Sequence, residues 1–390
     1  MNEITNLLTR GVENIYPTKE ELEKILRNGK KLKLYQGFDP SMPSLHLGNF
    51  AGVMKLRQFQ KLGHEIIFLI GDFTAMIGDP DKLSVRKPLT REETRHNSEN
   101  WKDQIKNIID FEGPNPAKLL YNSEWLDKVS FKDLIEIASK FTTQQMLERD
   151  MFQKRINEGR PVYLHELLYP VAQAYDCVFM DVDLELAGKD QTFNALAGRT
   201  LMNALKGKDK FVMTTKLLVD TKGDKVGKTT GNALFLDLTP EKFYGGIMSF
   251  PDEVIALGFE LLTEVDLAGI EEKIKEKPMA EKKRLAFEIV KLLWGEKSAK
   301  KAQTEFENIY QKNAVPNLET KIIKNIKLED VLVELNLVKS KSEAKRVIEQ
   351  GGVDVGEENV VNHNFEVPAN KEVIIKIGKT RFVKIRVNQK

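Results

Sequence analysis

The amino-acid sequence predicts an α/β fold with a parallel sheet near the N-terminus, then a helical part and a small α+β part. Three patterns carry this prediction. A strand over 32–38, a helix over 47–62 and a near-continuous apolar strand over 65–70 make a βαβ unit. Helical spacing dominates from Pro240 onward, and alternating residues over 373–387 are typical of a hairpin.

The βαβ unit also predicts where ligands bind. Its first strand is followed by a Pro/Ser loop over 39–44, and its helix stops at Gly63, a residue type that commonly follows a helix end. Ligands of such sheets collect at the carboxyl ends of the strands. The segments 35–49 and 71–80 lie at that edge.

The other elements follow from caps and apolar periodicity. A mostly helical stretch over 90–152 begins at the capping box Thr90–Glu93, and another capping box, Ser340–Glu343, starts a short helix that ends at Gly351–Gly352. Further expected elements are a helix over 165–178, a strand over 184–186, helices over 190–205 and 240–311, and a linker over 313–324.

Composition is typical of a globular protein with two or three domains. The 390 residues are 41% hydrophobic and 30% charged, with a net charge of +2. A single cysteine, Cys177, excludes an intramolecular disulfide and a zinc site built on a cysteine pair. We expect no signal peptide, no membrane span and a cytoplasmic location. Basic charge concentrates at the C-terminus, where seven Lys/Arg and one acid lie between Lys371 and Lys390.

Two short motifs suit a triphosphate. His46-Leu47-Gly48-Asn49 opens a helix with an imidazole, an accessible backbone and an amide, and Lys225-Val226-Gly227-Lys228-Thr229 brings two ammonium groups and a hydroxyl. A plain helix cap and a solvated lysine loop are the simpler interpretations. A Walker A loop is rejected, because Gly223 stands four residues before Gly227 where that pattern requires five.

Three polar residues share one face of the helix expected over 165–178. Tyr169, Gln173 and Asp176 stand at i, i+4 and i+7, and such a polar stripe is poorly explained as core. Asp190, at the start of the next helix, suits an N-cap, a ligand contact or both.

These residues resemble the bacterial tyrosyl-tRNA synthetases, which are class I enzymes, over essentially the whole chain. The segments Gly37–Ser41 and Leu45–Asn49 are similar to the family's HIGH region, and Lys225–Thr229 to its KMSKS loop. Gly71–Pro80, the Tyr169/Gln173/Asp176 stripe and Asp190-Gln191 also match. The chain departs from the pattern at Asn49, Val226-Gly227 and Lys189, but it keeps an amide donor and both lysines.

The resemblance implies a fold, an activity and partners. The expected domains are a Rossmann-like catalytic domain with a helical insertion (1–238), an α-helical anticodon-region domain (239–320) and an S4-like RNA-binding domain (321–390). The implied reaction is ATP-dependent activation of L-tyrosine, with Mg²⁺ held mainly by ATP, and transfer of the tyrosyl group to tRNA(Tyr). A homodimer is implied, with 131–152 as a candidate interface.

The resemblance also implies site residues. Tyrosine would contact Tyr35, Gly37, Thr74, Asp79, Tyr169, Gln173, Asp176 and Gln191. ATP would contact Asp39, His46, Gly48, Asn49, Gly188, Asp190, Lys225 and Lys228. Catalysis would fall to His46, Asn49, Lys225, Lys228 and Thr229, helped by Lys82 and Arg86 from a mobile loop. RNA would contact Lys341, Lys345, Lys384 and Arg386. No protein metal ligands are expected.

Three alternatives stay open on the sequence. A tryptophanyl-type enzyme would share the nucleotide motifs, although an indole offers no hydroxyl to Tyr35 and Asp176. An RNA-binding protein that has lost catalysis would explain Asn49 and Val226-Gly227. Catalysis without an RNA role is disfavoured by the basic C-terminal hairpin.

Overall fold

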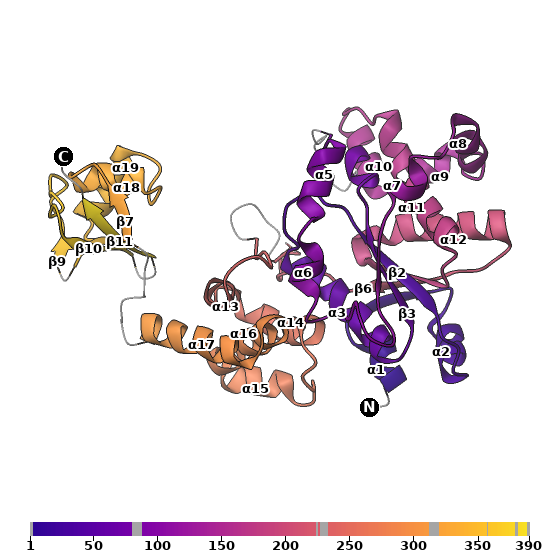
Figure 1. The fold of residues 1–390 in the computed structure, drawn as a ribbon, viewed down its shortest axis with the longest axis horizontal. Coiled ribbons are helices and arrows are strands. Elements are labelled where there is room, and N and C mark those ends of the chain that lie inside the picture. The colour runs from indigo at the N-terminus through magenta and orange to yellow at the C-terminus, as the bar shows by residue number, and fades with distance from the viewer. Residues whose placement is uncertain are drawn as a thin grey trace. The chain divides into compact units, whose positions relative to one another are not determined.

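The computed structural model describes residues 3–79, 88–223, 225–226, 233–311, 320–356, 358–378 and 381–387. The chain divides into two compact units, the first ending at Lys300 and the second starting at Lys301. Each unit has its own sheet, and strands of both sheets are labelled in Figure 1.

The first unit is built on a six-stranded sheet in the order β1-β6-β5-β2-β3-β4. The strands are β1 (Val12–Tyr16), β2 (Lys33–Phe38), β3 (Glu65–Ile70), β4 (Lys118–Tyr121), β5 (Leu184–Gly188) and β6 (Phe211–Thr215). All neighbouring pairs are parallel except β1 with β6. The carboxyl ends of five strands therefore meet at one edge.

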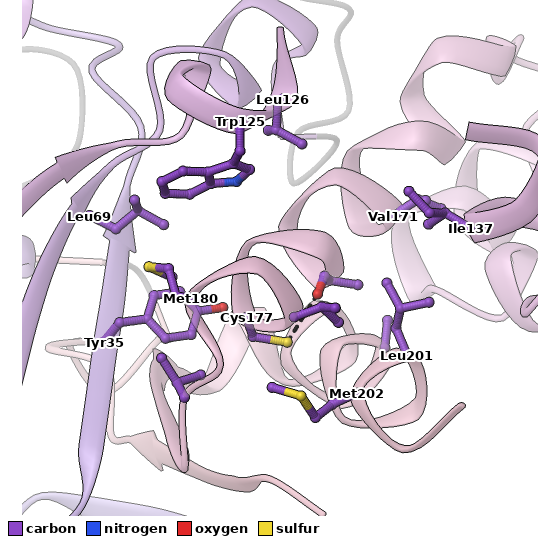
Figure 2. Close-up of a cluster of buried hydrophobic side chains, with 14 of the residues drawn as sticks. Tyr35, Leu69, Trp125, Leu126, Ile137, Val171, Cys177, Met180, Leu201 and Met202 are labelled. Carbon is purple, nitrogen blue, oxygen red and sulfur yellow. Dashed lines mark hydrogen bonds between the residues drawn. The ribbon is translucent and has the colours of Figure 1, made fainter. Parts of the chain in front are cut away.

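Helices cover both faces of this sheet. Tyr35, Ile67 and Leu69 point to one face, where they join an apolar cluster with α11 (Leu164–Met180) and α12 (Thr192–Lys206), shown in Figure 2. Neighbouring Gln36 points the opposite way and packs on Gly52 of α3 (Leu47–Lys61), because successive strand residues alternate between faces. The sheet is thus a central layer.

The remaining elements of the first unit are short helices around this layer and a helical part after it. Before and within the sheet region these are α1 (Glu3–Thr9), α2 (Lys19–Arg27), α4 (Thr74–Ile77), α5 (Arg91–Ser98), α6 (Trp101–Ile105), α7 (Ser123–Leu126), α8 (Phe131–Ala138), α9 (Thr143–Leu147), α10 (Asp150–Asn157) and the 3₁₀ turn η1 (Lys189–Gln191). After it come α13 (Pro240–Met248), η2 (Asp252–Val254), α14 (Ile255–Leu262), α15 (Ile270–Glu276), α16 (Pro278–Trp294) and α17 (Glu296–Gln311), which runs across the unit boundary.

The second unit has a five-stranded sheet in the order β7-β11-β10-β8-β9. Its elements are β7 (Thr320–Ile323), α18 (Leu328–Glu334), α19 (Lys341–Glu349), β8 (Val353–Val355), β9 (Glu358–Val360), β10 (Glu372–Ile377) and β11 (Arg381–Val387). Only β7 and β11 pair in parallel. The two helices and the sheet bury a common apolar core of their own.

The predicted fold class is confirmed, with corrections in detail. The βαβ unit, the helix over 165–178 (164–180 in the structure) and the C-terminal hairpin are present. The mostly helical stretch over 90–152 also contains β4, and the expected linker over 313–324 contains β7 at its end. Both strands have four residues, too short for a periodic signal. No helix among the described residues combines the length and apolar character that crossing a bilayer requires.

Candidate active site

A cavity opens at the carboxyl edge of β2, β3, β5 and β6. Every residue predicted to contact tyrosine or ATP that the structure describes lines this cavity. These residues are Tyr35, Gly37, Asp39, His46, Gly48, Asn49, Thr74, Asp79, Tyr169, Gln173, Asp176, Gly188, Asp190, Gln191 and Lys225. Lys82, Arg86, Lys228 and Thr229 lie outside the described residues.

The first motif forms the start of α3. His46 is the N-cap: its Nδ1 accepts from the Asn49 backbone N–H at 3.2 Å, and Asn49 Oδ1 accepts from the His46 N–H at 3.0 Å. A Cβ at Gly48 would lie 3.0 Å from Cε1 of His46, so the imidazole covers this glycine closely. The helix N-terminus beside them favours an anion.

The second motif lies beside the first. Lys225 Nζ donates to Asp190 Oδ2 at 2.5 Å, so the lysine reaches the end of β5. On the far side of this loop, Leu234 accepts a backbone hydrogen bond of 2.9 Å from Leu47, the first residue of α3. Segments almost half a chain apart therefore form one wall of the cavity.

The deep end of the cavity holds a buried carboxyl group. Asp176 on α11 accepts from Trp125 Nε1 at 2.8 Å and from Asn122 Nδ2 at 3.2 Å. Burial raises its pKa well above the usual range, and the two donors oppose that rise. Tyr35 lines the same end; its buried hydroxyl has no hydrogen bond of good geometry within the described part of the chain, although burial, and then the nearby Glu185 carboxylate, raise the pKa of this hydroxyl. A buried, unsatisfied hydroxyl is costly unless a ligand pairs with it.

A second group of polar side chains lies near the first. Asp39 accepts from Tyr169 Oη at 2.9 Å and from Thr74 Oγ1 at 2.7 Å. Burial, and then the Asp39 carboxylate, raise the pKa of Tyr169 well above its usual value, which keeps this hydroxyl protonated. Five carboxylate side chains line the cavity and suit a ligand with a positive charge: Asp39, Asp79, Asp176, Glu185 and Asp190.

Asp79 is held from two sides. Arg149 Nη2 donates to its Oδ1 at 2.7 Å, and Gln191 Nε2 donates to its Oδ2 at 2.5 Å. Arg149 is only 6% exposed and does not line the cavity, so it supports Asp79 from behind.

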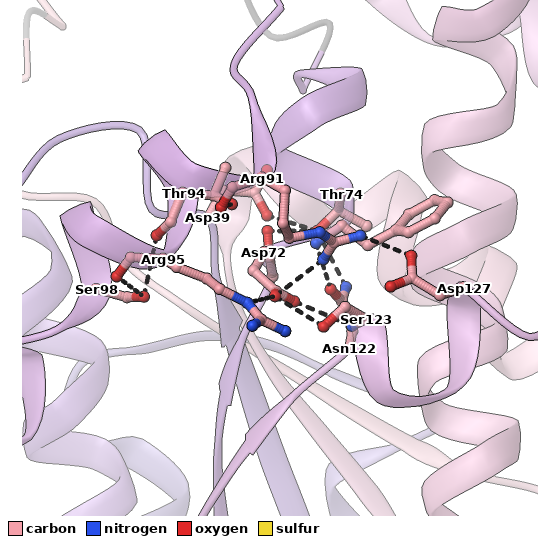
Figure 3. Close-up of polar contacts among 12 residues, drawn as sticks. Asp39, Asp72, Thr74, Arg91, Thr94, Arg95, Ser98, Asn122, Ser123 and Asp127 are labelled. Atoms are coloured by element: carbon pink, nitrogen blue, oxygen red, sulfur yellow. Dashed lines mark hydrogen bonds and ion pairs between the residues drawn. The ribbon is translucent and has the colours of Figure 1, made fainter.

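A polar network fixes the base of this region (Figure 3). The fully buried Asp72 accepts from Ser123 Oγ at 2.7 Å and pairs with Arg91 of α5 at 2.9 Å. The next residue towards the cavity, Asn122, accepts from the Phe73 backbone N–H at 2.9 Å and donates to Thr74 Oγ1 at 3.1 Å. Asn122 is thereby oriented with its amide nitrogen towards Asp176.

The comparisons with known proteins agree over most of the chain. The family described as tRNA synthetases class I (W and Y) matches residues 27–311, and the S4 domain matches residues 326–373. A tyrosine–tRNA ligase of Thermotoga maritima is 42% identical over 98% of this chain and 97% of its own length. One from Aquifex aeolicus is 41% identical over 94% of each. This chain belongs to the tyrosyl-tRNA synthetase family of class I.

Solved structures of tyrosyl-tRNA synthetases share the fold. A truncated mitochondrial enzyme from Coccidioides posadasii has a TM-score of 0.65 at 24% identity, covering 77% of this chain and 91% of that one. An Archaeoglobus fulgidus enzyme, solved with L-tyrosine, has a TM-score of 0.60 at 21% identity, covering 77% and 99%. At these identities the likeness is one of fold.

The RNA-binding residues predicted from the family lie in the second unit. Lys341 pairs with Asp330 at 2.5 Å and Lys345 lies 3.9 Å from Glu329, both on α18. Lys384 and Arg386 on β11 share Glu372, at 2.5 and 3.4 Å. Each of the four side chains keeps 30% or more of its surface exposed, so each can reach a phosphate.

Four functional candidates were missed by sequence reasoning. Asn122 follows β4, so a correct prediction of that strand would have placed it at the ligand edge. Trp125 follows on α7. Arg149 contacts Asp79 from behind the cavity and Glu185 lines the cavity wall beside Gln173, and no local pattern marks either position.

Proposed function

We propose that this chain activates L-tyrosine with ATP, releases pyrophosphate and transfers the tyrosyl group to tRNA(Tyr). The observation that supports it best is the pair at the deep end of the cavity. The Tyr35 hydroxyl can donate to a phenolic oxygen, and Asp176 can accept from the phenolic O–H. Phenylalanine would leave both groups unpaired.

Such a pocket selects by the cost of unsatisfied polar groups. Tyrosyl-tRNA synthetases as a class reject phenylalanine by a factor of about 10⁵ without editing. This factor describes the enzyme class. Tryptophan would fit poorly for a related reason, because an indole brings no hydroxyl to this end.

The charged end of the substrate would lie among the carboxylates. The α-ammonium would bind Asp79, Tyr169 and Gln173, with Asp39, Thr74 and Gln191 supporting them through the hydrogen bonds described above. Gly37 on β2 leaves room beside the ring. This arrangement directs the substrate's carboxylate towards the nucleotide.

ATP would occupy the wall formed by the two motifs. Asp190 would accept from the ribose hydroxyls beside Gly188, where a Cβ would lie only 2.6 Å from Asp190 Oδ1. The tyrosine carboxylate attacks the α-phosphorus in line and the bond to pyrophosphate breaks. His46, Asn49 and Lys225 would stabilise the charge that builds on the phosphates. We extend the same role to Lys228, Thr229, Lys82 and Arg86 on the basis of the sequence alone.

Magnesium would arrive on the nucleotide. Mg²⁺ commonly uses phosphate oxygens and water with few protein ligands. Among the described residues, no group of three or more His, Cys, Asp or Glu is arranged to hold a metal ion. Held mainly by ATP, the ion would neutralise charge at the phosphates.

The tRNA, the dimer and the domain limits belong to the same proposal. The second unit would contact tRNA(Tyr) through Lys341, Lys345, Lys384 and Arg386. A homodimer would use the region over 131–152, where Phe131 and Ile135 of α8 are 78% and 57% exposed. The catalytic, anticodon-region and RNA-binding domains would span 1–238, 239–320 and 321–390, and the protein would work in the cytoplasm.

The test is ATP–pyrophosphate exchange with tyrosine, tryptophan, phenylalanine or no amino acid. Exchange with tyrosine alone is the expected result. Exchange with tryptophan would overturn the substrate, and no exchange in folded protein would favour an RNA-binding protein without catalysis.

A further inference from the structure

A buried ion pair lies at the wall of the cavity, where Glu185 is a lining residue and Lys210 is not. Glu185 on β5 is 1% exposed and Lys210, just before β6, is fully buried. Lys210 Nζ contacts Glu185 Oε2 and also donates to the Ala195 carbonyl at 3.2 Å. The other carboxylate oxygen of Glu185 accepts from Gln173 Nε2 at 3.0 Å. Nothing in the reaction itself uses this pair.

The fold makes room for the pair at a glycine. Gly198 on α12 faces it, and a Cβ there would lie 2.7 Å from Lys210 Nζ and 3.2 Å from Glu185 Oε2. Any larger residue would have to displace the ion pair or the Cys177 thiol beside it. The pair therefore occupies a space built by α12, β5 and the start of β6.

The chemistry of a carboxylate decides how Gln173 is oriented. A glutamine amide has an oxygen that accepts and a nitrogen that donates, whereas an ionised carboxylate only accepts. Glu185 therefore attracts the amide nitrogen of Gln173 and leaves the amide oxygen for the cavity. An α-ammonium group has three donors and no acceptor, so it needs that oxygen.

We propose that the Glu185–Lys210 pair is a positioning element that holds the Gln173 carbonyl oxygen towards the α-ammonium of the substrate. The proposal rests on the proposed function, in which Gln173 contacts that group. Lys210 supplies the opposite charge that a buried carboxylate needs, because a buried charge without a partner is costly.

The test removes the pair and compares ligands that differ in one group. Glu185→Gln alone would leave Lys210 buried and unpaired, so the working variant is Glu185→Gln with Lys210→Met, checked for folding by circular dichroism. Binding is measured by equilibrium dialysis for L-tyrosine and for 3-(4-hydroxyphenyl)propionate, which lacks the amino group. We expect the Kd of tyrosine to rise about tenfold, typical of a weakened hydrogen bond to a charged group, and that of the propionate to change less than about twofold.

Two further variants separate the possible failures. Gln173→Ala should weaken tyrosine selectively, and adding it to the pair variant should cost little more, because both act through one hydrogen bond. Glu166→Gln with Arg155→Met removes another buried ion pair, on α10 and α11 outside the cavity, and should leave both ligands unchanged.

Three results would overturn the proposal. Equal losses of both ligands in the pair variant would make the pair general structural support. Unchanged tyrosine binding there, with selective loss in Gln173→Ala, would refute the pair's role and keep that of Gln173. Equal losses in Gln173→Ala would refute the ammonium assignment in the proposed function, and this proposal with it.

Discussion

Replacing Asp176 with asparagine tests the phenol pocket with the smallest change of shape. In the structure both carboxylate oxygens already accept one hydrogen bond, at 2.8 Å from Trp125 and at 3.2 Å from Asn122. Each oxygen keeps a lone pair for a ligand. An asparagine has only one oxygen, so its NH₂ group must face one of these two donors or the ligand's O–H.

The expected loss follows from that count. One hydrogen bond to a charged acceptor inside the protein disappears, and the bond from the phenolic O–H weakens because the acceptor is neutral. The first loss is present with and without substrate, so it lowers stability and leaves kcat/KM unchanged. The second is worth about 1.5–3 kcal/mol, so kcat/KM for tyrosine should fall by about 10–10². Phenylalanine never makes the phenolic bond, so its much lower activity should fall far less.

The assay is ATP–pyrophosphate exchange with both amino acids, on protein whose melting temperature has been measured. The matched control is Asp183→Asn at the opposite end of β5, where the side chain accepts from the Lys33 backbone N–H at 2.9 Å. It should leave the ratio of the two substrates unchanged. An equal fall for both substrates in Asp176→Asn, or no fall for tyrosine, would refute the reasoning.

Three more predictions concern other parts of the molecule. Arg149→Met should raise the KM for tyrosine about tenfold and leave the KM for ATP nearly unchanged, because Asp79 loses the guanidinium that fixes it. The control is Arg160→Met, at an exposed arginine. Equal shifts in the KM of both substrates would contradict this role of Arg149. Removing residues 320–390 takes away the whole second sheet and core, so tyrosine activation should persist while tRNA charging falls strongly; undiminished charging would refute an RNA role. Burial lowers the pKa of His64 from 6.5 to about 4, so its neutral ring stabilises the fold fully above pH 6.5 and loses that contribution as the pH falls to about 4. Urea titrations should show this loss as a fall of about 2 kcal/mol in the free energy of unfolding, a value that allows for partial solvent screening. His64→Gln should abolish this part of the pH dependence.

Strong periodicity made much of the fold predictable. The β2–α3–β3 unit, α11 and the final hairpin have long or regular apolar patterns, and the structure has them within a few residues of the prediction. The short strands β1, β4 and β6 were not predicted, although β5, which is also short, was. Because β4 was not predicted, the position of Asn122 at the ligand edge of the sheet was missed.

The cavity residues that belong to sequence motifs could be predicted. Those that depend on hydrogen bonds to residues distant in the sequence could not. His46, Asp190 and Lys225 lie together as their motifs indicate. The hydrogen bonds of Glu185 and Arg149 come from residues distant in the sequence, and such pairings depend on how the elements pack. A local pattern has no means of specifying them.

The reciprocal hydrogen bonds between His46 and Asn49 bear on how this motif can evolve. The Asn49 side chain accepts from a backbone N–H to complete the helix start, and in the proposed function it also contacts the nucleotide. Only a few polar side chains can accept this hydrogen bond at the N3 position of a helix, and asparagine is one of them. The last position of the HIGH motif can therefore hold any of several polar residues. Each of them would preserve the same start of the helix.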